Sequence, residues 1–216
     1  METGFTRQNV EKINKSSYLT RKNLELVLGS NRRTLDYRIK SMLSSNLITK
    51  LKQGFYISNK YLEKEQNTEL YLEYIGCILK QPAYVSLQYA LAKYNLIPES
   101  VFDITYVTTK KTGKYVTPLR AFIYKSIADD LFTGYATLEY KEKVVNFAYP
   151  YKAVFDLFYY ENLSNKDSIK EFISSSRINW DNLDRVNKLN LKKLIKKVNI
   201  KKMNDLLKVL DAEKII

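Results

Sequence analysis

The sequence predicts an α+β fold, with a small N-terminal domain at residues 1–60 and a larger domain of mixed strands and helices at residues 66–216 that ends in helices. In the first domain apolar residues recur at helical spacing and then alternate with polar residues. Between Pro98 and Pro150 the period is two, which is typical of strands, and after Pro150 it is helical again. These changes of period predict the order of the elements.

Composition narrows the classes of function. The chain has 216 residues, 45% of them hydrophobic, and neither a long apolar run nor a signal-like N-terminus, so we expect a cytoplasmic protein with no membrane partner. With no His and one Cys it has no Ser-His-Asp or Cys-His nucleophile and no ordinary zinc site. Phosphate-binding glycine loops are absent as well. We therefore expect no catalytic residues, no metal and no cofactor, and we expect Cys77 to be a buried, inert thiol.

The positive charge lies at the two ends of the chain. Residues 1–60 hold twelve Lys and Arg against four Asp and Glu, and residues 177–216 hold eleven against five. The intervening residues 61–176 hold thirteen against fourteen, although the whole chain carries a net charge of +13. A near-neutral middle between basic ends indicates a polyanionic partner for the first domain.

Three helices are predicted in the N-terminal domain. Val10 and Ile13 lie on the apolar face of the first helix. Thr20 is placed to cap the start of the second helix and Gly29 to end it, while Asn31 begins the third. Four residues of the third helix share an apolar face: Leu35, Ile39, Met42 and Leu43.

The other side of the third helix is basic. Two short helices joined by a tight turn that contains glycine are typical of the helix-turn-helix, whose second helix enters the major groove of DNA. The segment LITKLKQGFYIS alternates around Gln53-Gly54 and predicts a two-stranded wing. We therefore predict a winged helix-turn-helix that binds double-stranded DNA, although a solvated basic face on a helical bundle is the alternative. The predicted DNA-binding residues are Asn31, Arg32, Arg33, Thr34, Tyr37, Arg38, Lys40, Lys50, Lys52 and Gln53.

The larger domain starts after a polar hinge at residues 64–67. Helices are expected at residues 69–79 and after Ser86, which is placed as an N-cap. The segment from Val101 to Ile127 is predicted as a hairpin that turns at Thr112-Gly113. The final helices carry lysines opposite an apolar face, which suits either a solvated surface or a surface that binds DNA or an acidic partner.

Three central segments carry a family resemblance. These segments follow the N-terminal domain and read AYVSLQYALAKYNLIPESV, VTTKK and AYPYKAVFDLFYY. Their order is that found in the AbiE-type antitoxins of bacterial abortive-infection (type IV toxin-antitoxin) systems. The chain resembles this family over roughly residues 5–210. The matching positions of the antitoxin-domain motif are Ser86, Pro98, Lys110, Lys152 and Asp156. The chain departs from the family pattern at Gln88, Asn95, Tyr149 and Tyr151.

The resemblance implies an antitoxin that represses its own promoter by binding inverted repeats. It also implies a nucleotidyltransferase-like toxin as a functional partner, with or without a stable complex, and a role in phage defence. A stand-alone transcriptional regulator is the alternative. A third hypothesis, an enzyme that uses Lys152 and Asp156, is disfavoured because an i,i+4 Lys/Asp pair is more typical of a helix surface.

Overall fold

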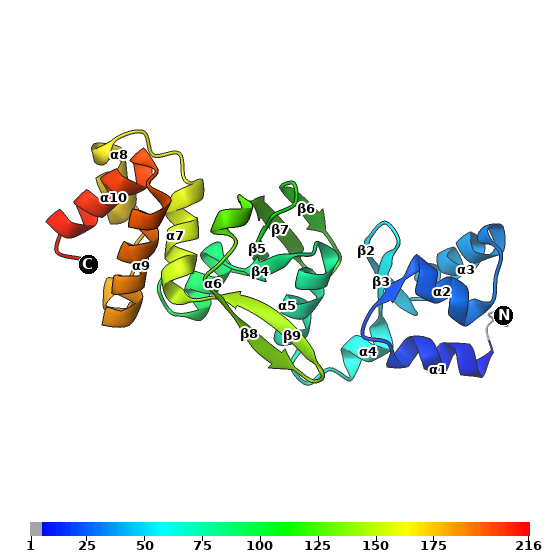
Figure 1. Ribbon diagram of the computed structural model, residues 1–216. Helices are drawn as coiled ribbons and strands as arrows, with labels where there is room; N and C mark the ends of the chain where they lie inside the picture. Colours follow the sequence, from blue (N-terminus) through cyan, green and yellow to red (C-terminus); the bar gives the residue numbers. More distant parts are fainter. Residues whose placement is uncertain (1–5) are drawn as a thin grey trace. The chain divides into compact units, whose positions relative to one another are not determined.

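The computed structural model describes residues 6–216, and these form a mixed α+β fold with 51% helix and 19% strand (Figure 1). The predicted α+β class is therefore confirmed. The chain divides into two compact units. Unit 1 comprises Met1–Ile75 and Tyr115–Ala121, and unit 2 comprises Gly76–Lys114 and Phe122–Ile216.

In unit 1, helices and a small sheet enclose one core. Its three-stranded sheet is antiparallel with the order β1-β3-β2. Its elements are α1 (Arg7–Lys15), β1 (Leu19–Thr20), α2 (Arg21–Leu28), α3 (Arg32–Ser44), β2 (Ile48–Lys52), β3 (Phe55–Ser58) and α4 (Asn59–Glu63). The core of this unit consists of Ile13, Leu19, Leu24, Leu28, Leu35, Ile39, Met42, Ile48 and Tyr56.

The predicted helix boundaries in unit 1 are confirmed by their caps. The Thr20 side chain accepts a hydrogen bond from the Asn23 amide, as a capping box requires. Gly29 ends α2 with φ of 56°, a left-handed conformation that glycine adopts at little cost. Asn31 caps α3 by accepting a hydrogen bond from the Thr34 amide at 3.0 Å.

A six-stranded mixed sheet, most of which lies in unit 2, has the order β6-β7-β5-β4-β9-β8. Strands β4 and β9 are parallel, as are β5 and β7, whereas β4 with β5 and β8 with β9 are antiparallel. The strands are β4 (Ala83–Val85), β5 (Ile104–Thr108), β6 (Gly113–Val116), β7 (Ala121–Ser126), β8 (Tyr135–Tyr140) and β9 (Lys143–Ala148). Helix α5 (Thr68–Leu79) begins in unit 1 and ends in unit 2. The helices of unit 2 are α6 (Leu87–Lys93), α7 (Pro150–Tyr160), α8 (Lys166–Ser175), α9 (Arg185–Val198) and α10 (Lys201–Ala212).

The hairpin predicted between Val101 and Ile127 is wrong. Strand β5 does not pair with β6; its neighbours are β4 and β7, and it runs parallel to β7. All five residues of β5 are buried, because the strand lies inside the sheet with both faces covered. Local alternation cannot distinguish such an interior strand from one arm of a hairpin.

Helix α7 lies between the sheet and α9 (Figure 1). Pro150 occupies its first turn, where the missing amide hydrogen costs nothing, as predicted. Seven consecutive residues from Lys152 to Phe158 are buried, so this helix is covered on nearly every side. Among residues 6–216, no helix is long and apolar enough to span a bilayer.

Candidate nucleic-acid interface

The turn between α2 and α3 is held by Arg38. One guanidinium nitrogen of Arg38 donates to the Leu28 carbonyl oxygen and to the Ser30 hydroxyl, each at 2.7 Å. Arg38 is half-buried, unlike the other basic residues of α3. Arg38 is among the predicted DNA contacts, but its guanidinium is already engaged by partners inside the unit.

The outward face of α3 is defined by the position of its core residues. Leu35 and Ile39 are buried, and at 3.6 residues per turn the side chains of Arg33, Tyr37 and Lys40 lie roughly half a revolution away from them. These three are exposed, with Tyr37 75% accessible. We call Arg33, Tyr37 and Lys40 the α3 outer stripe. Their spacing of four and three residues places them in one row along the helix.

The single acidic residue of α3 is neutralised from α2. Asp36 accepts a hydrogen bond from the Arg21 guanidinium and forms an ion pair with it. That hydrogen bond is the main cause of the lowered pKa of the Asp36 carboxyl and of the raised pKa of Arg21. Asp36 therefore subtracts little from the positive potential of the outer stripe.

The remaining predicted contacts in α3 lie at its N-terminus. Arg32 and Thr34 are exposed, and the Asn31 side-chain oxygen is occupied by the cap. Within residues 6–216, neither Arg32 nor Arg33 forms an ion pair. Their guanidinium groups are therefore available to an anionic ligand.

The β2–β3 hairpin supplies a second exposed basic position. Lys50 is exposed on β2, and Gln53 is exposed at the turn, where Gly54 has a positive φ of 72°. The ammonium of Lys52 lies 5.9 Å from the centre of the Phe55 ring, and this side chain is half-buried. Lys50 and Gln53 thus reach solvent more fully than Lys52.

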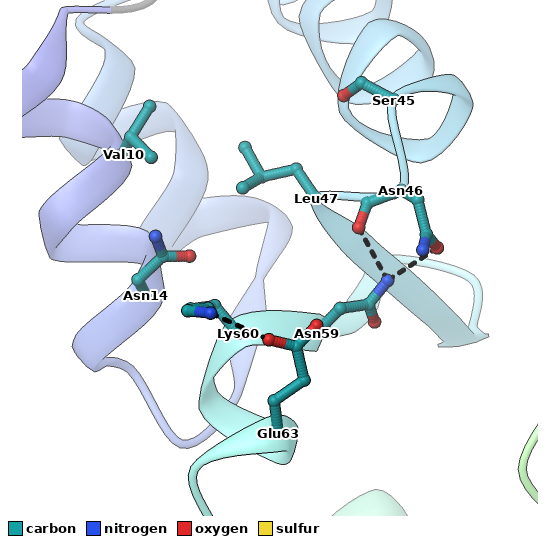
Figure 2. Close-up of a pocket in the computed structure, with 8 residues that line it drawn as sticks. All are labelled: Val10, Asn14, Ser45, Asn46, Leu47, Asn59, Lys60 and Glu63. Atoms are coloured by element: carbon teal, nitrogen blue, oxygen red, sulfur yellow. Dashed lines mark hydrogen bonds and ion pairs between the residues drawn. The ribbon is translucent and has the colours of Figure 1, made fainter.

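A polar cleft of about 390 Å³ opens elsewhere in unit 1, between α1, the α3–β2 turn and α4 (Figure 2). The Asn59 amide donates to the backbone and side-chain oxygens of Asn46, each at 2.7 Å, and Lys60 pairs with Glu63 at 2.9 Å. The side-chain amides of Asn46 and Asn59, which line this cleft, are therefore already hydrogen-bonded to each other. None of the outer-stripe residues lines this cleft.

Unit 2 contains a buried polar network that brings together three of the five family-motif residues. The Asp156 carboxylate accepts hydrogen bonds from Lys152 at 2.7 Å and Ser86 at 2.7 Å, and from Tyr84 at 3.0 Å. Neither Lys152 nor Asp156 has any accessible side-chain area. Burial raises the pKa of the Asp156 carboxyl, and the Lys152 ammonium and the three hydrogen bonds oppose that rise.

This network corrects two expectations. The Lys152–Asp156 pair was expected on a helix surface but is fully buried, because all other residues of α7 are apolar or aromatic and the helix packs on the sheet and on α9. Ser86 precedes α6 as predicted, but its hydroxyl makes no cap and instead donates to Asp156. The other motif residues, Pro98 and Lys110, are exposed and lie outside the network. Neither Lys152 nor Asp156 is accessible from the surface in this structure.

Two residues that take part in these interactions, Arg21 and Tyr84, could not be predicted from the sequence. Arg21 lies fifteen residues before Asp36, and Tyr84 lies 72 residues before Asp156, so no local spacing links either pair. The burial of Lys152 did have a signal, because every residue of the segment YKAVFDLFYY except Lys152 and Asp156 is apolar or aromatic. Cys77 is buried, as predicted.

Residues 6–216 contain no cluster of three or more potential metal ligands among His, Cys, Asp and Glu. No protein-family model matches the chain, and no curated protein matches it significantly. The assignment of function therefore rests on the residues themselves.

Proposed function

We propose that unit 1 is a winged helix-turn-helix that binds double-stranded DNA and represses transcription, with α3 as the recognition helix and the β2–β3 hairpin as the wing. The observation that carries this proposal is the α3 outer stripe: Arg33, Tyr37 and Lys40 are exposed in one row, and the only carboxylate of the helix is paired with Arg21. A helix with these properties can place arginine against guanine and tyrosine against base edges or methyl groups.

The wing supports the same proposal. Lys50 and Gln53 are exposed on a hairpin that follows α3 directly, and residues of this type bind phosphate oxygens. Contacts to phosphate fix the register of a protein on the duplex, whereas contacts from α3 specify the sequence. We therefore assign positioning to the hairpin and base recognition to the outer stripe.

For the whole chain we propose an autorepressing antitoxin of a type IV toxin-antitoxin system. The support is the order of the sequence segments that resemble AbiE-type antitoxins. Three of the matched positions, Ser86, Lys152 and Asp156, also meet in one network, as expected of residues that define a domain. Inverted repeats in its promoter would be the operator, and a nucleotidyltransferase-like toxin would be the functional partner. A stand-alone regulator would have no such toxin gene beside it.

The experiment for DNA recognition compares two arginine variants on promoter DNA. Arg33→Ala removes a residue of the outer stripe, whereas Arg7→Ala removes an arginine of the same unit whose side chain is 95% exposed on α1. We expect Arg33→Ala to weaken operator binding by about 1–3 kcal/mol, since a bidentate base contact contributes this much. Arg7→Ala should change it by less than about 0.5 kcal/mol. Equal effects of the two variants on operator binding would show that Arg33 on α3 does not contact the operator.

A separate experiment tests the antitoxin role. A neighbouring nucleotidyltransferase gene that encodes the toxin should arrest growth when it is expressed alone. Co-expression of the full chain should restore growth if the proposal holds. Growth arrest that is unchanged by the full chain would leave the regulator as the function.

A further inference from the structure

The polar cleft of unit 1 takes no part in the proposed DNA interface. Its volume of about 390 Å³ lies in the lower part of the range of about 300–1,000 Å³ that is usual for small-molecule sites. Residues from α1, from the α3–β2 turn and from α4 line it (Figure 2). The cleft therefore has room for a ligand of about the size of a nucleoside.

Two side-chain amides of the cleft retain hydrogen-bond donors for a ligand. The Asn14 amide oxygen accepts a hydrogen bond from the Ser58 hydroxyl at 3.0 Å, and the Asn46 amide oxygen accepts one from Asn59 at 2.7 Å. Within residues 6–216, neither the Asn14 nor the Asn46 amide nitrogen donates a hydrogen bond. Each of these nitrogens carries two N–H groups. The two amides thus offer donors to a ligand, while their oxygens are already engaged.

The other lining residues favour an uncharged ligand with a planar ring. Val10 from α1 and Leu47 from the α3–β2 turn supply aliphatic surface. The two charged lining residues, Lys60 and Glu63, pair with each other at 2.9 Å, so neither charge is left uncompensated for a ligand. Apolar walls with a few polar groups that fix the orientation of a ligand are typical of small-molecule sites.

The geometry points to an effector site: we propose that this cleft binds a nucleoside whose base carries two carbonyl oxygens, with uridine as the representative, and that the bound nucleoside strengthens operator binding. The carbonyl oxygens accept hydrogen bonds from the amides of Asn14 and Asn46, and the ring packs on Val10 and Leu47. The regulatory half of this inference rests on the DNA-binding function proposed for unit 1.

The position of the cleft links it to the proposed DNA interface. Ser45 ends α3, and Leu47 directly precedes β2, so the turn between them joins the proposed recognition helix to the proposed wing. Asn46, at the centre of this turn, has a positive φ of 56°, which is uncommon for a residue other than glycine. A ligand that contacts both the turn and α1 restricts the turn, so less conformational entropy is lost when DNA binds.

The test of binding is an NMR titration of the full, isotope-labelled chain with uridine. We expect saturable shifts of the side-chain amides of Asn14 and Asn46. Asn14→Asp keeps an oxygen that accepts from Ser58 but loses the N–H donors, and it should weaken uridine binding by about tenfold or more. The control Asn9→Asp makes the same change on α1 outside the cleft and should alter binding by less than about twofold.

A second variant guards against a local loss of structure. Asn46→Gly removes the other amide and preserves the positive φ, because glycine adopts this conformation readily. It should also weaken uridine binding by about tenfold. The absence of saturable shifts with uridine, or equal effects of Asn14→Asp and Asn9→Asp, would overturn the proposal.

Two other probes test the chemical class of the ligand. Cytidine has an amine in place of one carbonyl oxygen and should bind about tenfold more weakly than uridine, since the amine faces donors. Uridine monophosphate should bind no more tightly than uridine, because Lys60 is paired with Glu63. Equal binding of cytidine, or tighter binding of the monophosphate, would show that the proposed class is wrong.

The regulatory half is tested by titrating promoter DNA with and without saturating uridine. We expect uridine to tighten the binding of the wild-type chain by about fivefold or more, and to have no effect on Asn14→Asp. Unchanged or weaker DNA binding by uridine-loaded protein would overturn the regulatory half. A chain without preference for its promoter would contradict the function proposed for α3, whereas the NMR titration would still decide whether the cleft binds uridine.

Discussion

Replacing Lys152 with methionine isolates the energetics of the buried network. The substitution removes the ammonium that lies 2.7 Å from Asp156 and leaves a carboxylate with no accessible area and only the hydroxyl donors of Ser86 and Tyr84. Breaking a buried ion pair by deleting one partner costs about 3–5 kcal/mol, because the remaining charge is uncompensated. We expect Lys152→Met to lower the free energy of unfolding of unit 2 by this amount.

The double variant Lys152→Met/Asp156→Asn tests whether charge is the cause. Asparagine keeps an oxygen that can accept hydrogen bonds from Ser86 and Tyr84 but carries no charge. We expect the double variant to be more stable than Lys152→Met by about 1–2 kcal/mol, because the buried charge has been removed. A double variant as unstable as the sum of both single variants would refute this reasoning.

The pH dependence of the free energy of unfolding tests the same reasoning, because the direction of the change can be predicted. Burial already raises the pKa of Asp156 in the folded chain, and removal of the Lys152 ammonium raises it further. A carboxyl with a raised folded-state pKa favours folding at low pH and loses that contribution as pH rises. The destabilisation by Lys152→Met should therefore be larger at neutral pH than in mild acid.

Urea unfolding followed by tryptophan fluorescence is a suitable assay. Trp180 is the only tryptophan, and its ring lies 6.3 Å from that of Phe158 on α7, so its emission reports on unit 2. Circular dichroism at each pH gives the unfolding of the whole chain for comparison.

Three other substitutions follow from the contacts, each measured as the free energy of urea unfolding. Arg38→Ala should cost about 1–3 kcal/mol, because it removes charge-assisted hydrogen bonds at the α2–α3 turn, and a cost as small as that of Arg33→Ala would contradict this role. Gly76→Ala should destabilise by about 1–3 kcal/mol although alanine favours helices, since a Cβ would lie 2.0 Å from the Tyr106 hydroxyl; stabilisation would show that the ring yields. Thr20→Ala should cost about 1 kcal/mol through the lost cap, and no change would mean that solvent replaces it.

Local features of the fold could be predicted from the sequence, whereas long-range pairing could not. The cap residues Thr20 and Asn31 and the left-handed Gly29 lie where the sequence predicts them, because each depends on neighbours within four residues. The parallel pairing of β5 with β7 depends on residues separated by a crossover, and no periodicity encodes it.

The same limit applies to the candidate sites. The exposed residues of α3 could be predicted because the helical period determines which side faces the core. The diversion of Arg38 to the α2–α3 turn could not, since its partners are a carbonyl and a hydroxyl eight to ten residues away. The meeting of Ser86 with Asp156 requires the sheet to bring β4 beside α7, which local spacing does not reveal.

The central claim is that this chain recognises a specific DNA sequence, and a gel-shift titration tests it most directly. Full-length protein would be titrated on the DNA upstream of its own gene and on a scrambled duplex of the same composition, at several salt concentrations. We expect the promoter to bind at least about a thousandfold more tightly, as specific sites usually do, with affinity falling steeply as salt rises. Equal affinity for both duplexes would contradict the account.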